Sequence, residues 1–162
     1  MFNLVLLEPE IPSNTGNIAR TCAATGSRLH LIRPLGFSVS DRELKRAGLD
    51  YWNLVEIRIH DSLEAFFESE NPQRFWLTST KAAKSYAQAD FQDGDYIFFG
   101  KETRGLPESF IEENLSRAIR IPMREETRSL NLSNSAAIVL YEALRQTGFA
   151  GLLDHGKFGK QE

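Results

Sequence analysis

The sequence predicts an α/β fold, a Rossmann-like and mostly parallel sheet with helices on both faces. Short apolar segments alternate along the chain with segments whose apolar residues recur at helical spacing. Such alternation is typical of parallel strands joined by crossover helices. With 162 residues, 41% of them hydrophobic, the chain has apolar material for one core, so one domain is expected.

The pattern predicts a strand and then a helix at the amino terminus. Residues 2–7 are short, apolar and typical of a buried strand. Ser13 and Asn14 offer N-cap chemistry for a helix that runs to about residue 25. Gly26 then stands at the position of a left-handed C-terminal cap.

The middle of the chain continues the alternation. Residues 28–32 are the second expected strand, and residues 54–59 are a third because their apolar residues alternate. Residues 40–43 and 61–64 have the spacing of capping boxes, so each should open a short helix.

The remaining elements complete the sheet. Further strands are expected over residues 75–78, 96–99 and 118–121. Pro107 is placed as the first-turn proline of a helix around residue 110. Ser133 should cap a final amphipathic helix, whose apolar face is Ala136, Val139, Leu140, Ala143 and Leu144. Residues 151–162, rich in Gly and Lys, are expected to form a flexible tail.

Composition limits the classes of function. The sequence has no basic leader before an apolar segment and no apolar run as long as a membrane span, so a cytoplasmic protein is expected. The single cysteine, Cys22, excludes an internal disulfide. The net charge of −3 argues against a nucleic-acid partner, because phosphate-binding proteins are usually basic. A local basic patch can nevertheless coexist with this charge.

Several common signatures are missing. The turn after the first strand is not G-x-G-x-x-G, and residues 100–102 do not have the order of a Walker loop. The G-x-S-x-G motif of hydrolases is also absent. The potential zinc ligands are scattered without ligand spacing: His30, His60, His155 and Cys22. No metal site is therefore expected.

Unusual polar residues gather instead in three segments near the ends of expected strands. Residues 14–20 read Asn-x-x-Asn-Ile-x-Arg, residues 99–107 read Phe-Gly-x-Glu-x-x-Gly-Leu-Pro, and residues 129–134 read Ser-Leu-Asn-Leu-Ser-Asn. In a parallel sheet, ligands bind beyond the carboxyl ends of the strands. The sequence therefore predicts a site that draws on all three segments.

In this order, the three segments resemble the motifs of the SPOUT methyltransferases, in the branch that methylates ribose 2′-hydroxyls of RNA. Within that branch, the resemblance is nearest to minimal enzymes that act on the wobble nucleotide, cytidine or uridine 34, of tRNA. It spans residue 4 to about residue 148. It implies one methyltransferase domain over residues 1–150, with a deep trefoil knot over roughly residues 75–150.

The resemblance also implies partners. It implies a homodimer formed through the first and last helices, which fits their small or apolar positions Ala19, Ala23, Ala24 and 136–144. The resemblance is to minimal enzymes without the added RNA-binding domain of some relatives, so the dimer surface itself is expected to bind tRNA. The basic residues that flank the cofactor loops are the candidates for this contact: Lys81, Lys84, Arg124 and Arg128.

For the cofactor, the resemblance implies S-adenosyl-L-methionine as methyl donor and S-adenosyl-L-homocysteine as product. The positions that match the family's cofactor-binding loops are Thr78, Gly100, Glu102, Ile121, Met123, Ser129 and Leu130. Leu130 stands where close relatives often have methionine, a change of similar volume.

For catalysis, the resemblance implies a group made of Arg20, Asn14, Glu102, Ser129 and Asn131. A guanidinium group stays protonated in proteins, so Arg20 is expected to pair with the phosphate beside the target ribose and to stabilise the developing alkoxide. Asn14 would orient Arg20 or the ribose, and the other three residues would shape the pocket.

Plainer roles remain open for these residues. Asn14 has the chemistry of a helix cap, Arg20 that of a solvated or ion-paired residue, and Glu102 that of a group at the start of the following helix. The same reaction on ribosomal RNA or at another tRNA position is an alternative function. A non-catalytic RNA-binding assembly factor is a second alternative, which the intact catalytic positions argue against.

Overall fold

The structure is a computed structural model that describes residues 1–162 except 41, 43–50, 154 and 157–162. The helix expected to open at residues 40–43 therefore lies largely outside the described residues, as do positions 154 and 157–162 of the expected tail. Within the described part of the chain, seven strands form one sheet in the order β3-β2-β1-β6-β4-β7-β5. Each neighbouring pair is parallel, as the α/β class requires.

The elements have the following bounds. The strands are β1 (Asn3–Leu7), β2 (Arg28–Ile32), β3 (Ile57–His60), β4 (Phe75–Thr78), β5 (Lys84–Ser85), β6 (Tyr96–Phe99) and β7 (Ala118–Arg120). The helices are α1 (Pro12–Thr25), α3 (Leu63–Glu70), α4 (Glu108–Glu112) and α5 (Leu132–Gln146). Single 3₁₀ turns are η1 (Trp52–Leu54), η2 (Tyr86–Gln88) and η3 (Leu115–Arg117).

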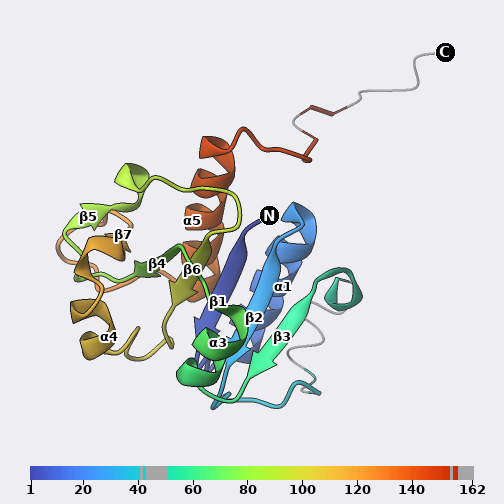
Figure 1. Cartoon of the computed structure of the whole chain (residues 1–162), viewed down its shortest axis with the longest axis horizontal. Helices are drawn as coiled ribbons and strands as arrows, with labels where there is room; N and C mark the ends of the chain where they lie inside the picture. The colour runs from blue at the N-terminus through green and yellow to red at the C-terminus, as the bar shows by residue number, and fades with distance from the viewer. Residues whose placement is uncertain (41, 43–50, 154, 157–162) are drawn as a thin grey trace.

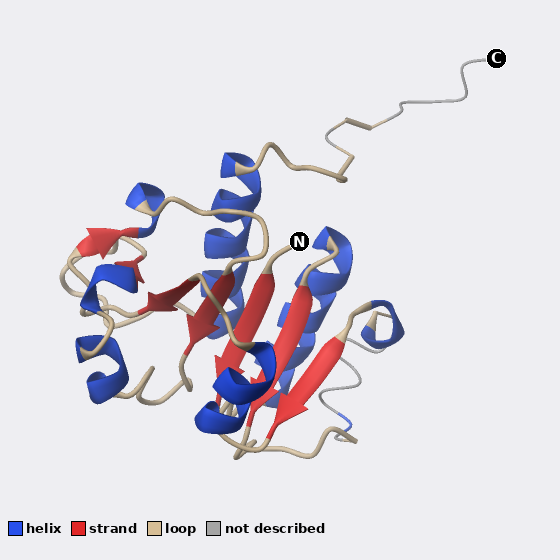
Figure 2. Ribbon diagram, in the orientation of Figure 1, coloured by secondary structure: helices blue, strands red, loops and turns tan. Residues whose placement is uncertain are grey.

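The sheet lies between two helical layers. Helices α1 and α5 cover one face, and α3 and α4 lie against the other (Figure 1). Figure 2 shows the strands running side by side between these layers. Alternate residues of β1 enter the two cores, since Leu4 and Leu6 pack with α1 and α5 while Val5 and Leu7 pack with α3 and α4. None of the described helices has both the length and the apolar character needed to cross a membrane.

Several predicted strands are confirmed, and one is corrected. Residues 28–32, 75–78 and 96–99 match β2, β4 and β6 at both ends. The expected strand over residues 54–59 is too long, because Leu54 belongs to η1 and its side chain is 71% exposed. The short strand β5 was not predicted, since a Lys-Ser pair carries no apolar pattern.

The start of α1 differs from the expectation. The helix begins at Pro12, with Ile11 as an N-cap whose side chain makes no capping bond. Ser13 and Asn14 therefore lie inside the first turn and do not cap the helix. At the other end Gly26 adopts φ +67°, the left-handed cap that the sequence predicts.

The caps of the other helices also lie one or two residues from their predicted places. The Ser62 hydroxyl, and not Asp61, caps α3 by accepting from the Ala65 amide at 3.1 Å. Pro107 is the N-cap of α4 and so precedes its first turn. The side chain of Asn131, and not Ser133, caps α5. The predicted apolar face of α5 is buried as expected.

The histidines were predicted to be scattered, and for two of them the structure shows otherwise. His30 on β2 and His60 at the end of β3 lie on adjacent strands, with Nδ1 of the first 3.1 Å from Nε2 of the second. The last residue of α3, Glu70, lies beside both imidazoles. Sequence spacing could not reveal this cluster, because parallel strand pairing aligns residues that are far apart in the chain.

Candidate active site

A pocket of about 580 Å³ opens at the carboxyl ends of β4, β6 and β7. Three loops form most of its wall, within residues 78–81, 99–106 and 121–132. The lining includes most of the residues predicted for the site: Asn14, Thr78, Gly100, Glu102, Ile121, Met123, Ser129, Leu130 and Asn131. The structure thus brings together parts of all three sequence segments, at the edge of the sheet where a parallel fold binds ligands.

The wall combines apolar residues with polar and charged residues of the loops. Leu106, Ile111 and Ile121 supply apolar surface. Thr78 donates its hydroxyl to the Phe98 carbonyl at 2.7 Å, so that hydroxyl is already used within the sheet. Polar and charged side chains, among them Lys81, Glu102 and Arg128, also line the pocket, and its volume is in the range of small-molecule sites.

The loop after β6 folds back on itself at a glycine. A Cβ on Gly100 would lie 1.9 Å from the Gly105 carbonyl carbon and 2.1 Å from the Leu106 nitrogen. The Gly105 amide donates to the Lys101 carbonyl at 2.8 Å and closes the loop. Only glycine fits at position 100, and the tight turn carries Glu102 at its tip.

Glu102 stabilises the start of a helix, although not the helix that follows it. Its carboxylate accepts hydrogen bonds from the Glu10 amide at 2.8 Å and the Ile11 amide at 3.0 Å. It also accepts from Asn14 Nδ2 at 3.2 Å. These donors lie at the amino end of α1, where a negative charge is favoured by the helix dipole. Glu102 thus takes the place of the missing side-chain cap.

Asn14 links the first and third segments. Its Oδ1 accepts from Asn131 Nδ2 at 3.0 Å, while its Nδ2 is held by Glu102. The Oδ1 of Asn131 in turn accepts from the amides of Ser133 and Asn134, at the start of α5. A continuous hydrogen-bonded chain, Glu102–Asn14–Asn131, therefore connects all three predicted segments.

A second set of contacts joins the loop between β1 and α1 to the loop after β6. None of these contacts was predicted from the sequence. Lys101 donates to Glu8 at 2.6 Å, and Glu10 accepts from both the amide and the hydroxyl of Thr103 at 3.0 Å. Opposite charges in the two loops, Glu8 and Glu10 in one and Lys101 in the other, are the only sequence signal for this pairing. These residues fix the position of Glu102 beside α1.

Arg20 lies elsewhere. It is exposed on α1, and its guanidinium carbon is 4.8 Å from the centroid of the Tyr51 ring. It does not line the pocket of its own chain. The Asn14 amide is engaged by Glu102 and Asn131 and not by Arg20 of the same chain, so a role in orienting the ribose stays a prediction.

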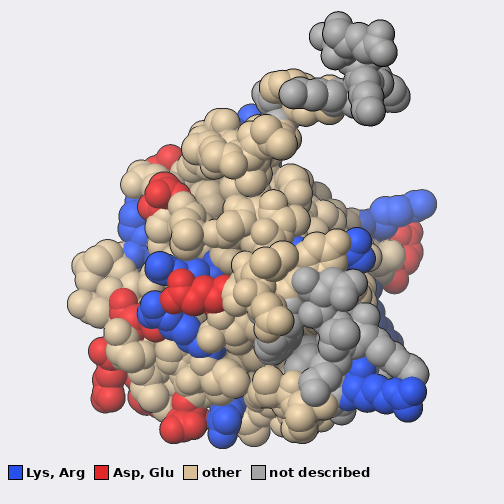
Figure 3. All heavy atoms as spheres, turned by 90° about the vertical axis from the view of Figure 1, so that its right-hand side faces the viewer, with Lys and Arg blue, Asp and Glu red and all other residues tan. Residues whose placement is uncertain are grey.

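The candidate RNA-contacting cations have different surroundings. Lys81 and Arg128 line the pocket, where Lys81 is paired with Glu108. Lys84 lies over the Trp76 ring, with Nζ 5.0 Å from its centroid. Trp76 itself is buried in the core. On the face shown in Figure 3, basic and acidic side chains are interspersed, so the described residues there present no continuous basic surface.

The chain is similar to known proteins over nearly its whole length. The SpoU rRNA Methylase family matches residues 1–141. The tRNA (cytidine(34)-2′-O)-methyltransferase of Escherichia coli K12 is 51% identical over 152 residues, which cover 93% of this chain and 97% of that protein.

Solved structures show the same likeness in three dimensions. One, described as giving insights into 2-OH methylation of C/U34 on tRNA, is 50% identical and has a TM-score of 0.83, covering 91% of this chain and 97% of the other. An AdoMet-bound rRNA methyltransferase from Sinorhizobium meliloti is 25% identical, with a TM-score of 0.79 over 89% of this chain and 56% of the other.

Proposed function

The chain belongs to the SpoU rRNA Methylase family, and from this membership we propose that it methylates the ribose 2′-hydroxyl of nucleotide 34, the wobble position, of tRNA in the cytoplasm. The proposal rests above all on the chain Glu102–Asn14–Asn131, which joins the three motif segments beside one pocket. Relatives that share half of the residues over almost the full length carry this activity in their names.

The pocket fits S-adenosylmethionine as the methyl donor. Its volume of about 580 Å³ lies in the range of roughly 300–1,000 Å³ that is usual for ligands of this size. When bound, S-adenosylmethionine supplies a methyl group activated by a sulfonium centre and leaves as S-adenosylhomocysteine. The residues that would hold it are Thr78, Gly100, Glu102, Ile121, Met123, Ser129 and Leu130. The relative from S. meliloti, described as AdoMet bound, supports this assignment.

Arg20 requires a second protomer. In its own chain it lies outside the pocket, on α1, which packs beside α5. Ala19 and much of the 136–144 face, first expected at a dimer surface, are buried in the chain's own core. Ile138 and Tyr141 of α5 remain exposed, and a homodimer through α1 and α5 would cover them. Such a dimer would carry Arg20 of one protomer towards the pocket of the other.

In that arrangement each side chain has a defined task. Arg20 pairs with the phosphate beside the target ribose through its planar fork of donors and stabilises the 2′-oxygen as its proton leaves. The proton passes to that phosphate or to water. Asn14, Glu102 and Asn131 keep the pocket loops in place, while Ser129 lies on the wall where the ribose enters.

The domain organisation is part of the same proposal. Residues 1–150 form one methyltransferase domain, and its part from about residue 75 to residue 150 forms the trefoil knot of the SPOUT enzymes. The parallel sheet and the return of α5 against α1 support this organisation.

Methyl transfer from labelled S-adenosylmethionine is the direct test. Unfractionated tRNA and ribosomal RNA are offered separately, and the modified nucleotide is located by nuclease digestion and mass spectrometry. We expect label in the ribose of nucleotide 34 in a subset of tRNAs. Label at another nucleotide would replace the substrate, and the absence of label from all RNA despite cofactor binding would contradict the enzymatic proposal.

A further inference from the structure

A second group of potential ligands lies outside the methyl-transfer pocket. His30 on β2, His60 on β3 and Glu70 on α3 each offer one ligand atom, and these three atoms all lie within 4.8 Å of one another. His30 Nδ1 and His60 Nε2 are 3.1 Å apart. Glu70 Oε1 is 4.0 Å from the first of these nitrogens and 3.9 Å from the second. None of the three residues lines the pocket described above.

This triangle is close in size to one face of a tetrahedral metal site. Zinc bonds of about 2.0–2.1 Å to nitrogen and oxygen place neighbouring ligand atoms about 3.3 Å apart. The observed separations require shifts of well under an ångström to reach that geometry. The His30 side chain is fully buried, and those of His60 and Glu70 are each 8% exposed, so the ligands are held by their surroundings.

The outer nitrogen of each imidazole has an oxygen partner. His30 Nε2 lies 3.4 Å from Asn3 Oδ1, and Asn3 is fixed by its own bond to the Gly94 carbonyl. His60 Nδ1 lies 3.3 Å from the Ser69 hydroxyl, which is also 3.2 Å from the Phe66 carbonyl. Partners of this kind orient metal-binding histidines and set their tautomer.

The outer partners influence which ring nitrogens of His30 and His60 carry protons. Ser69 has one hydroxyl proton, and when it donates to Phe66 the outer nitrogen of His60 must donate to Ser69. With His30 donating to Asn3, both inner nitrogens then present lone pairs to each other at 3.1 Å. In this tautomer a cation between them and Glu70 removes the repulsion, whereas in the other tautomer of His60 its Nε2 donates to His30 Nδ1.

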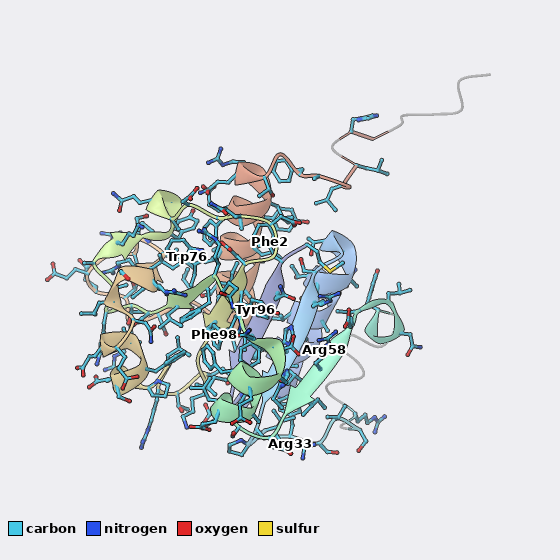
Figure 4. All side chains as sticks on the ribbon, in the orientation of Figure 1. Phe2, Arg33, Arg58, Trp76, Tyr96 and Phe98 are labelled. Carbon is cyan, nitrogen blue, oxygen red and sulfur yellow. The ribbon has the colours of Figure 1, made fainter. Side chains whose placement is uncertain are left out.

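Glu70 is held with one oxygen towards the imidazoles. Arg58 Nη1 is 3.0 Å from both carboxylate oxygens, and the Tyr96 hydroxyl donates to Oε2 at 3.3 Å. Figure 4 labels both residues, Arg58 on β3 and Tyr96 on β6. Arg58 also bonds Glu56, so its charge is partly neutralised from outside the cluster.

We propose that His30, His60 and Glu70 bind one transition-metal ion of the zinc class, with water as the fourth ligand. Two imidazoles and a carboxylate favour Zn²⁺, Co²⁺ or Ni²⁺ over Mg²⁺ or Ca²⁺, which prefer oxygen ligands. The ion joins β2, β3 and α3 and acts as a structural link. The site is independent of the methyl-transfer reaction.

Metal titration of the chelator-treated full chain tests this site without any activity assay. We expect one Co²⁺ per chain with the visible absorption of a tetrahedral complex, displacement by one Zn²⁺, and a raised melting temperature. His60→Asn and Glu70→Gln should lose this binding, whereas His155→Asn, the control at the third histidine, should keep it. Asn3→Ala, which removes the outer partner of His30 together with the Asn3–Gly94 bond, should weaken binding about 10–100-fold.

Arg58→Gln separates the proposal from a purely structural polar network. Arg58 competes with a metal for Glu70, so removing it should strengthen metal binding several-fold, whereas a network that depends on Arg58 would only lose stability. Failure of the wild-type chain to bind Co²⁺ or Zn²⁺ stoichiometrically would overturn the proposal. Equal binding by wild type and His60→Asn would also overturn it, because the ion would then lie elsewhere.

Discussion

Glu102 places a carboxylate at the amino end of α1, where two backbone amides and the side chain of Asn14 all donate to it. Hydrogen bonds to a charged acceptor are among the stronger ones in proteins. A single side chain therefore caps a helix and sets the position of a residue in the pocket. Its structural and functional effects must be measured separately.

Replacement of Glu102 by glutamine tests this double role. The amide nitrogen would face donors that now meet a carboxylate oxygen, so we expect Glu102→Gln to lower the free energy of unfolding by about 1–3 kcal/mol. It should also weaken binding of S-adenosylmethionine. Urea denaturation and calorimetry measure the two effects. Glu112→Gln, an exposed change on α4, is the control, and equal stability of the two variants would contradict the prediction.

Arg20 gives a contrasting case, because it is exposed and outside the pocket. Lysine cannot reproduce a bidentate contact with phosphate. We expect Arg20→Lys to reduce kcat about tenfold or more while the affinity for S-adenosylmethionine is unchanged. Steady-state methyl-transfer assays and cofactor titration measure these quantities, with Arg33→Lys as an exposed control. Near-normal turnover with unchanged RNA affinity would exclude the assigned role.

The buried imidazole of His30 makes stability depend on pH. Burial lowers its pKa from 6.5 to about 4, despite the opposing effect of Glu70. Between these values the unfolded chain binds a proton that the folded chain does not, so the free energy of unfolding falls as the pH drops from about 6.5 towards 4. The stabilisation is complete above that window.

Urea denaturation of the chelator-treated protein at pH 7 and pH 5 measures this loss. We expect a decrease of up to about 2 kcal/mol that is specific to His30. His30→Asn should flatten the dependence, and His155→Asn should leave it as in the wild type. Equal slopes in all three proteins would show that another group controls the titration, such as His60, whose pKa burial also lowers from 6.5.

At the scale of elements, the turn between β6 and α4 depends on glycine at position 100. Gly100→Ala would place a methyl group against the backbone of Gly105 and Leu106, which cannot move aside as a flexible side chain could. We expect a loss of more than about 2 kcal/mol in stability and no measurable cofactor binding. Gly156→Ala, where the added Cβ meets no atom within 4 Å, is the control. Normal cofactor binding by Gly100→Ala would contradict the described turn.

The elements were predictable to different degrees for physical reasons. The strands β2, β4 and β6 are short segments rich in apolar residues between loop residues, so local sequence defines both of their ends. The caps were less predictable. The start of α1 is capped by Glu102, which is 91 residues from the Ile11 amide, and no local pattern contains that contact.

At the scale of the whole molecule, the site requires contacts between distant segments and, as we propose, between two chains. A family resemblance predicted which residues line the pocket. It could not predict the hydrogen bonds among those residues. Asn131 reaches Asn14 across 117 residues of sequence, and this pairing exists only once the sheet is complete. The placement of Arg20 outside its own pocket was also not predictable from motif order.

Subunit mixing tests the proposed sharing of residues. Arg20→Ala and Asn131→Ala should each be inactive as homodimers, because every site lacks one component. After subunit exchange at equal amounts, about half of the dimers are mixed and hold one intact site, so about one quarter of wild-type activity should return. Restoration is measured by methyl transfer to tRNA. Without any recovery despite proven exchange, Arg20 would have to act within its own chain.

In the middle of the sheet β1 pairs with β6, and the paired residues are about 90 positions apart in the sequence. A chain emerging from a ribosome can therefore form β1, α1 and β2 early but cannot cover the other edge of β1 until β6 has been made. The amino-terminal half waits with an unpaired, apolar strand edge, which is prone to association with other chains. Translation speed through the second half, and chaperones that shield strand edges, should therefore influence the yield of folded protein more strongly than they would for a fold with local strand pairing.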